Sequence, residues 1–246
     1  MKIVIADDYQ GMSRLAADAI EACVAAKPDC VLGLATGTTP IGLYDLLAQD
    51  CAEGKVSFAD VTTYNLDEYC GLAPEHPQSY RYFMNEQLFD RVNIDKARTH
   101  VIEACAEDAD AVCAAYEAAI EAAGGIDLQL LGLGHNGHIG FNEPNDAFDK
   151  ATHKVELTQS TIEANSRLFD SIDEVPRAAL TMGIGTIMAA RSIVLVANGA
   201  GKAQIVHDAL FGPVTPQVPA SILQFHPNVM VFVDAEAGSL IADKLA

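Results

Sequence analysis

The chain has 246 residues, of which 50% are hydrophobic, and its formal net charge is −19. This length and composition fit one large α/β domain, whereas the negative charge argues against nucleic-acid binding because phosphates would be repelled. An anionic small molecule would therefore need a local cationic pocket.

Apolar runs and amphipathic stretches alternate along the whole chain. Short apolar runs predict strands at 2–6, 31–35, 61–66, 100–102, 126–131, 154–157, 178–182, 193–197 and 229–233. The stretches between them predict helices at 12–24, 40–48, 79–89, 108–123, 161–169, 184–190, 203–210 and 221–225, and a last helix that ends at 245. This alternation predicts an α/β fold with a mostly parallel sheet and helices on both faces, without a dividing linker.

The most informative stretch is 128–144, L-Q-L-L-G-L-G-H-N-G-H-I-G-F-N-E-P, which begins as a strand and then becomes rich in glycine. Its glycines and polar residues include Gly132, Gly134, His135, Asn136, Gly137, His138, Asn142 and Glu143. Open α/β sheets bind ligands at such turns, so we interpret the loop as a candidate site rather than only a structural turn. His138 is the leading acid–base candidate because histidine titrates near neutral pH.

Two other ligand classes are less consistent with this loop. The third glycine of G-L-G-H-N-G comes one position too early for the dinucleotide-binding fingerprint. His135 and His138 are separated by glycine rather than placed on a helix face, and no cysteine or second acidic residue completes a metal-ligand set. We therefore expect no metal site here.

A second loop, 35–42, reads A-T-G-T-T-P-I-G and leads into the helix that Pro40 begins, with Thr39 as the expected N-cap. Backbone N–H groups at a helix N-terminus favour an anion. The residues that would supply them are Thr36, Gly37, Thr38 and Thr39. The loop lacks the lysine of a P-loop, so it does not imply a nucleoside triphosphate, and an ordinary capped turn explains it equally well.

The third predicted strand leads directly into N-L-D-E-Y at 65–69. Asp67 or Glu68 could serve as a general base, but adjacent residues point in different directions, so at most one should face a substrate. On these residues alone, an exposed acidic turn is the favoured interpretation.

Two basic residues could bind an anion locally. Lys202 ends the glycine-rich N-G-A-G-K at 198–202 and Arg167 lies in A-N-S-R-L-F, although either could be a solvated surface charge. Taken with the carboxylates and histidines, they predict proton transfer or hydrolysis on a small phosphate ester without a cofactor. Residue chemistry alone does not select the sugar.

The sequence also indicates a compartment. No stretch approaches the roughly 18 apolar residues of a membrane span, and the N-terminus M-K-I-V-I-A-D-D becomes acidic too early for a signal peptide. The six cysteines have no C-x-x-C spacing and all lie in the first half of the chain. We expect free thiols in a cytoplasmic protein that contacts no membrane.

Five motifs resemble those of the glucosamine-6-phosphate deaminase family, in the family order: L-A-T-G-T-T-P, N-L-D-E-Y, L-G-L-G-H-N-G-H-I-G-F-N-E-P, A-N-S-R and A-L-T-M-G-I-G-T-I. The resemblance implies conversion of glucosamine 6-phosphate and water to fructose 6-phosphate and ammonia, with no metal or organic cofactor. It also implies a doubly wound, Rossmann-like single domain over 1–246, of the kind shared with 6-phosphogluconolactonase and ribose-5-phosphate isomerase.

Residue roles follow from the same resemblance, position by position. Asp67 matches the general base that moves the C2 proton of the ring-opened sugar to C1. His138 matches the residue that opens the pyranose at the ring oxygen, and Glu143 the acid that orients it. Asn136 stands where some members have aspartate, and it can hydrogen-bond but cannot carry charge. The implied phosphate contacts are Thr36, Gly37, Thr38, Thr39, Arg167 and Lys202.

The resemblance also bears on assembly and on alternative functions. Some members are hexamers activated by N-acetylglucosamine 6-phosphate through basic residues after F-N-E-P. Here only Lys150, His153 and Lys154 are basic in that segment, so we expect a monomer or small homo-oligomer without this activation. The alternatives are a 6-phosphogluconolactonase-like hydrolase, disfavoured by F-N-E-P and D-E-Y, and a non-catalytic sugar-phosphate-binding regulator, disfavoured by the complete set of catalytic matches.

Overall fold

The computed structural model describes residues 1–166 and 169–245. Its centre is a seven-stranded sheet in which all neighbouring strands are parallel. In spatial order the strands are β1 (Lys2–Ala6), β10 (Val229–Asp234), β9 (Ser192–Ala197), β6 (Leu128–Gly132), β2 (Val31–Leu34), β3 (Thr62–Asn65) and β5 (Thr99–His100). From β2 the chain proceeds outward to β3 and β5, and from β6 in the opposite direction to β9 and β10. The expected doubly wound sheet is confirmed, and its order reverses between β2 and β6.

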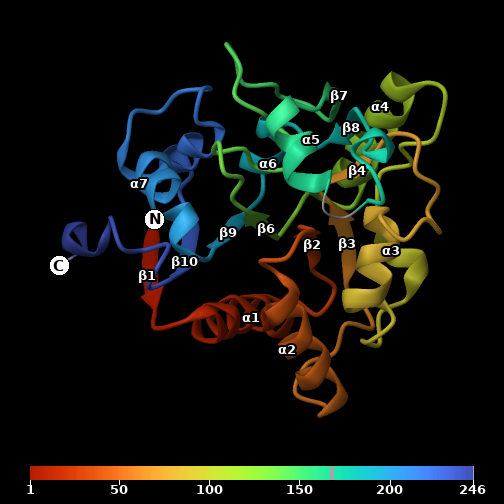
Figure 1. Ribbon diagram of the computed structural model, residues 1–246. Helices are drawn as coiled ribbons and strands as arrows, with labels where there is room; N and C mark the ends of the chain where they lie inside the picture. Colours follow the sequence, from red (N-terminus) through yellow and green to blue (C-terminus); the bar gives the residue numbers. More distant parts are fainter. Residues whose placement is uncertain (167–168, 246) are drawn as a thin grey trace.

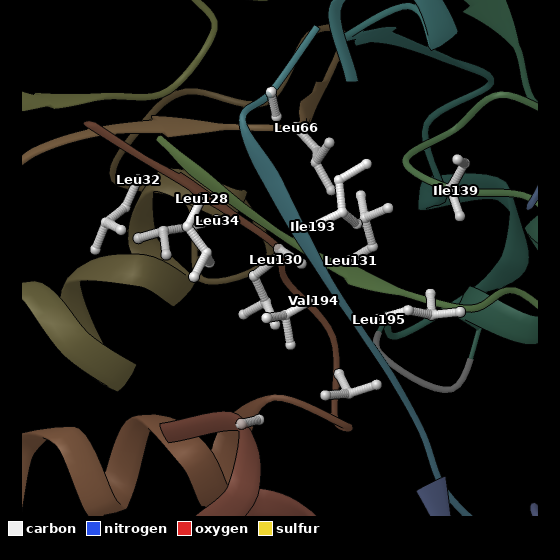
Figure 2. Close-up of a cluster of buried hydrophobic side chains, with 14 of the residues drawn as sticks. Leu32, Leu34, Leu66, Leu128, Leu130, Leu131, Ile139, Ile193, Val194 and Leu195 are labelled. Atoms are coloured by element: carbon white, nitrogen blue, oxygen red, sulfur yellow. The ribbon is translucent and has the colours of Figure 1, made fainter. Parts of the chain in front are cut away.

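The three central strands carry the core. Leu130 and Leu131 are adjacent on β6, so their side chains point to opposite faces of the sheet, and both are fully buried. Figure 2 shows them among leucines, isoleucine and valine of β2 and β9. Burial on both faces explains why these strands are continuously apolar and easily recognised from sequence.

Helices lie on both faces of this sheet, as expected. They are α1 (Tyr9–Ala26), α2 (Ile41–Ala52), α3 (Tyr80–Met84), α4 (Ala109–Ala122), α5 (Gln159–Asn165), α6 (Ile184–Met188) and α7 (Ala203–Phe211). In Figure 1, α1 and α2 lie below the central strands, and α6 and α7 lie above them. In the described part of the chain, no helix is both long and apolar enough to cross a membrane.

A second, smaller sheet was not anticipated. It joins β4 (Asp67–Tyr69), β8 (Ala178–Thr181) and β7 (His153–Glu156) in antiparallel pairs. Between β3 and β4, Leu66 bonds to both parts: its N–H donates to Leu34 of β2, and its carbonyl accepts from Met182 just after β8. N-L-D-E-Y is therefore a strand of a second sheet rather than a turn.

Two local expectations are wrong. Thr39 does not cap α2: its hydroxyl donates to Asn198 Oδ1 at 2.8 Å, and the N-cap position is Pro40, with no side-chain bond. The last helix is replaced by turns and a short 3₁₀ helix, Ala242–Lys244. In the first of these turns, the side chain of Asp234 accepts the Ala237 N–H and its carbonyl accepts the Gly238 N–H. The six cysteines are free, as expected.

Candidate active site

A cavity of about 460 Å³ lies where the carboxyl ends of β2, β3, β6 and β9 converge. This is the point at which the strand order reverses, the usual ligand position in open α/β sheets. The four segments singled out in the sequence all contribute to its wall, through Thr36–Thr39, Asp67, Asn136 with His138, and Lys202. Segments far apart in the chain therefore form one site.

The threonine loop is held by residues outside it. Gly37 has φ +97°, a backbone conformation that favours glycine. The Tyr9 hydroxyl donates to the Thr39 carbonyl at 3.0 Å and accepts from the Gly42 N–H at 2.8 Å. With Thr39 bonded to Asn198, these contacts fix the loop against α1 and the loop after β9. The loop is thus a rigid cavity wall ahead of α2, suited to an anion.

Asp67 is the acidic group of this cavity. Its residue is 6% exposed, and no described residue donates a hydrogen bond to its carboxylate. Burial, and secondarily the negative charge of Glu68, raise the pKa of Asp67 to about 8. Gly140 leaves room beside it, since a Cβ there would lie 2.9 Å from Thr181 Oγ1 and 3.5 Å from Asp67 Oδ2. The expected exposed acidic turn is wrong, because both acidic residues are buried.

His138 and Glu143 form a pair on the opposite loop. His138 Nδ1 lies 3.5 Å from Glu143 Oε2, which also accepts from the Asn136 side chain at 2.5 Å. Glu143 Oε1 accepts hydrogen bonds from the hydroxyls of Thr158, at 3.3 Å, and Thr161. Burial opposes the charge, but these partners, His138 first, lower the pKa of Glu143 to about 2. The pair presents the imidazole to the cavity with a permanent carboxylate behind it.

Gly134 of this loop allows the His138 ring to approach the backbone closely. A Cβ at Gly134 would lie 2.3 Å from the His138 ring, so only glycine lets the ring pack over this backbone. The Gly134 N–H donates to the His138 carbonyl at 2.9 Å, which closes the loop. The G-L-G-H-N-G spacing thus sets the place of the imidazole.

Lys202 supplies positive charge to the cavity. Its ammonium donates to the Leu133 carbonyl at 2.6 Å, and burial lowers its pKa to about 8. The charge of Lys202 is the main cause that lowers the pKa of the neighbouring His135. Arg167, the other basic residue predicted to contact the phosphate, lies outside the described residues.

Sequence reasoning missed part of the cavity wall. Tyr80 from α3, Phe141, Thr161 and Asn165 all line it. Tyr80 and Phe141 stack with 6.0 Å between ring centroids. Thr158 is the N-cap of α5, so a threonine before a predicted helix was a usable signal for that turn. No local pattern marks Tyr80, because it reaches the cavity only through the tertiary fold. Among the described residues, no three histidine, cysteine, aspartate or glutamate side chains gather as a metal-ligand set.

Known proteins resemble this chain in sequence and in fold. A family model described as glucosamine-6-phosphate isomerases/6-phosphogluconolactonase matches residues 7–231. A protein of Thermoanaerobacter pseudethanolicus named glucosamine-6-phosphate deaminase is 50% identical over 244 residues, or 99% of this chain and 96% of that protein. A solved structure of a monomeric glucosamine-6-phosphate deaminase matches with a TM-score of 0.95 at 43% identity, covering 98% of this chain and 100% of that one.

More distant likeness is limited to the fold. The 6-phosphogluconolactonase of Trypanosoma cruzi matches with a TM-score of 0.79 at 17% identity, over 98% of this chain and 97% of its own. Identity of 43% and 50%, by contrast, extends over nearly the full length of the chain. The chain therefore belongs to the glucosamine-6-phosphate deaminase family of enzymes.

Proposed function

We propose that this enzyme converts glucosamine 6-phosphate and water to fructose 6-phosphate and ammonia, with Asp67 and His138 as separate proton carriers. One observation carries the proposal: a buried carboxylate without hydrogen-bond donors and a carboxylate-backed imidazole line one cavity that also holds a lysine. The names of the relatives support the substrate.

Phosphate binding is assigned to the threonine loop and Lys202, with Arg167 proposed from the family resemblance. The backbone N–H groups of Thr36–Thr39 precede α2, and Lys202 adds a cation on the same cavity. In a chain of net charge −19, a dianionic group would be held by such local contacts against the overall field. The sugar would then extend toward Asp67 and His138.

Ring opening is assigned to His138. The imidazole would pass a proton between the anomeric hydroxyl and the ring oxygen, so that the C1–O5 bond breaks and an aldehyde forms. Glu143 would orient the ring and stabilise its protonated form, since its carboxylate stays ionised at any ordinary pH. Asn136 donates to Glu143 and stays neutral, so we assign it a supporting bond rather than a proton relay.

Isomerisation is assigned to Asp67. Its carboxylate would remove the C2 proton while the C1 oxygen takes a proton from the substrate ammonium, leaving an enol with a neutral amino group on C2. Asp67 would then return the C2 proton to C1. The resulting C2 iminium adds water, the C–N bond breaks, and ammonia leaves with fructose 6-phosphate. With its pKa near 8, Asp67 is a stronger base than an ordinary carboxylate, and the substrate ammonium would favour its ionised form.

An ammonia-release assay tests the proposal. Purified protein is supplied with glucosamine 6-phosphate, with unphosphorylated glucosamine and with 6-phosphogluconolactone. We expect ammonia and fructose 6-phosphate from the first only. Lactone hydrolysis without ammonia would replace the proposal with a lactonase, and binding without turnover would indicate a regulator. We also propose a monomer or small homo-oligomer, which light scattering checks; the matched structure is described as monomeric.

A further inference from the structure

Glu68 is a buried acid that the proposed reaction does not use. It is 3% exposed, and no lysine or arginine of the described chain lies within ion-pair distance of its carboxylate. Its partners are instead three backbone N–H groups, those of Tyr69, Tyr80 and Arg81, each at 2.9 Å. A buried charge is unfavourable unless its partners compensate for it, so this arrangement requires an explanation.

Two of these bonds, those from Tyr80 and Arg81, join two walls of the cavity. Tyr69 and Glu68 belong to β4, the strand that also carries Asp67, whereas Tyr80 and Arg81 form the first turn of α3. Asp67 and Tyr80 both line the cavity. The rings of Tyr69 and Tyr80 approach to 4.8 Å between centroids across the same junction. The Glu68 carboxylate therefore fixes the base-bearing strand against the helix that supplies the facing aromatic wall.

The Arg81 side chain attracts the Glu68 charge but makes no ion pair with it. The Arg81 guanidinium turns away and donates to Thr99 Oγ1 and to the Thr99 carbonyl, each at 2.8 Å. Burial raises the pKa of the Glu68 carboxyl, and the three backbone N–H groups and the Arg81 charge oppose that rise. In its ionised form, Glu68 places a negative charge beside Asp67. Because like charges disfavour ionisation, this supports the high pKa of the Asp67 carboxyl, for which burial is the larger cause.

Other groups around Asp67 do not substitute for this charge. Tyr69, Tyr80 and Tyr116 interact electrostatically with it, and burial raises the pKa of each phenol, so all three are neutral near pH 7. The remaining ionisable groups on the cavity are His135, His138 and Lys202, which are neutral or cationic. Of these groups, Glu68 is the one that can bring a negative charge close to the base.

We propose that Glu68 is a positioning residue for proton transfer, which holds Asp67 opposite Tyr80 by joining β4 to the first turn of α3. This inference rests on the proposed role of Asp67. The variant Glu68→Gln distinguishes this positioning role from a purely structural role of Glu68. The amide oxygen can still accept from Tyr69 and Tyr80, but the amide nitrogen cannot accept from Arg81, and the charge is lost.

The expected result for Glu68→Gln is a fall in kcat of roughly 10- to 100-fold with a smaller change in KM for glucosamine 6-phosphate. The acid limb of kcat/KM should move to lower pH, because loss of a like charge lowers the pKa of Asp67. Glu68→Asp keeps the charge but shortens the reach, so kcat should fall while the acid limb stays near that of the wild type. Glu103→Gln is the matched control: Glu103 is exposed and interacts with the same arginine, and its variant should retain both.

Carbon NMR of the Asp67 carboxyl gives a readout independent of turnover, and thermal unfolding shows which variants are folded. An Asp67 titration and kcat unchanged in folded Glu68→Gln would overturn the inference. If Glu68→Gln does not fold, Glu68→Asp decides: wild-type kcat in that variant overturns the positioning role. If the wild type itself releases no ammonia, the proposed function fails, while the NMR titration still tests the influence of Glu68 on Asp67.

Discussion

Asp67 and Glu143 are both buried carboxylates of one site, and their surroundings drive their pKa values apart. Glu143 is surrounded by donors from Asn136, Thr158 and Thr161 and by the His138 ring, and its pKa falls to about 2. Asp67 has no donor in the described structure and a like charge behind it, and its pKa rises to about 8. Burial is common to both, so the donors and the His138 charge around Glu143, which Asp67 lacks, account for the opposite directions of the shifts.

This contrast predicts a division of labour. A carboxylate held ionised by donors is a weak base but a good partner for a histidine, whereas a carboxyl without donors can exchange a proton near neutral pH. We therefore expect Asp67 variants to affect the carbon-bound proton and Glu143 variants to affect the imidazole. The following variants test that difference in decreasing order of expected effect.

Asp67→Asn should have the largest effect. Removing a general base typically costs 10²- to 10⁴-fold in rate, and the asparagine keeps the shape of the side chain. Ammonia release and exchange of the C2 proton with solvent should both fall by this factor, while binding of a non-reacting sugar phosphate should be retained. Near-wild-type C2 exchange would remove Asp67 from the role of base.

The same variant should be more stable than the wild type, which excludes misfolding as the cause of lost activity. The folded-state pKa of Asp67 is raised, so folding is penalised as pH rises from about 4 toward 8. Asp67→Asn should thus gain roughly 2–4 kcal/mol in unfolding free energy at pH 7, with the gain vanishing near pH 4. Urea titrations at the two pH values measure it, and an equal gain at both would contradict the high pKa.

His138→Gln should come next, with a loss of about 10²-fold on the natural substrate. Because His138 is assigned to ring opening, an acyclic analogue that cannot close should recover much of this rate, whereas Asp67→Asn should stay slow on it. Glu143→Gln should resemble the histidine variant more weakly, since it acts through His138. Equal rescue of Asp67→Asn and His138→Gln would refute the division of labour.

Lys202→Ala should change binding more than chemistry. Phosphate contacts act alike in ground and transition states, so KM for glucosamine 6-phosphate should rise by about tenfold or more while kcat changes less.

In the wild type, Lys202 loses its charge as pH rises through about 8, so KM should increase above that pH. Since Asp67 must ionise over the same range, kcat/KM should peak near pH 8. Lys154→Ala, an equal loss of charge at a half-exposed lysine of β7, is the control.

The parallel sheet could be predicted because its strands are apolar on both faces, as at Leu130 and Leu131. The small antiparallel sheet could not, because β4 is three residues long and reads D-E-Y. Its burial arises from pairing with β8, more than a hundred residues later in the chain. For the same reason Asp67 reads as an exposed turn in sequence and is buried in the fold.

The residues of the candidate site could likewise be predicted only in part from the sequence. Glycine-rich loops after β2, β6 and β9 are local signals, and they identified Thr36–Thr39, His138 and Lys202 as candidates. Tyr80 has no such signal, because tertiary contacts place α3 at the cavity, among them the bonds from its first turn to Glu68. The opposite pKa shifts of Asp67 and Glu143 are likewise a property of the assembled fold. Sequence gives residue types, but donors and burial are set in three dimensions.

Thr161→Val should give the smallest effect and the finest test of the comparison. The Thr161 hydroxyl donates to Glu143 Oε1, while Asn136 still bonds Oε2 in the variant, so Glu143 should remain ionised and only its placement should loosen. We expect a loss of about three- to tenfold on the pyranose and none on the acyclic analogue. Thr186→Val is the matched control, because it removes a hydroxyl donor at 2.7 Å to Glu117, remote from the cavity. A loss on the acyclic analogue as large as that on the pyranose would show that Thr161 contacts the substrate rather than supporting Glu143.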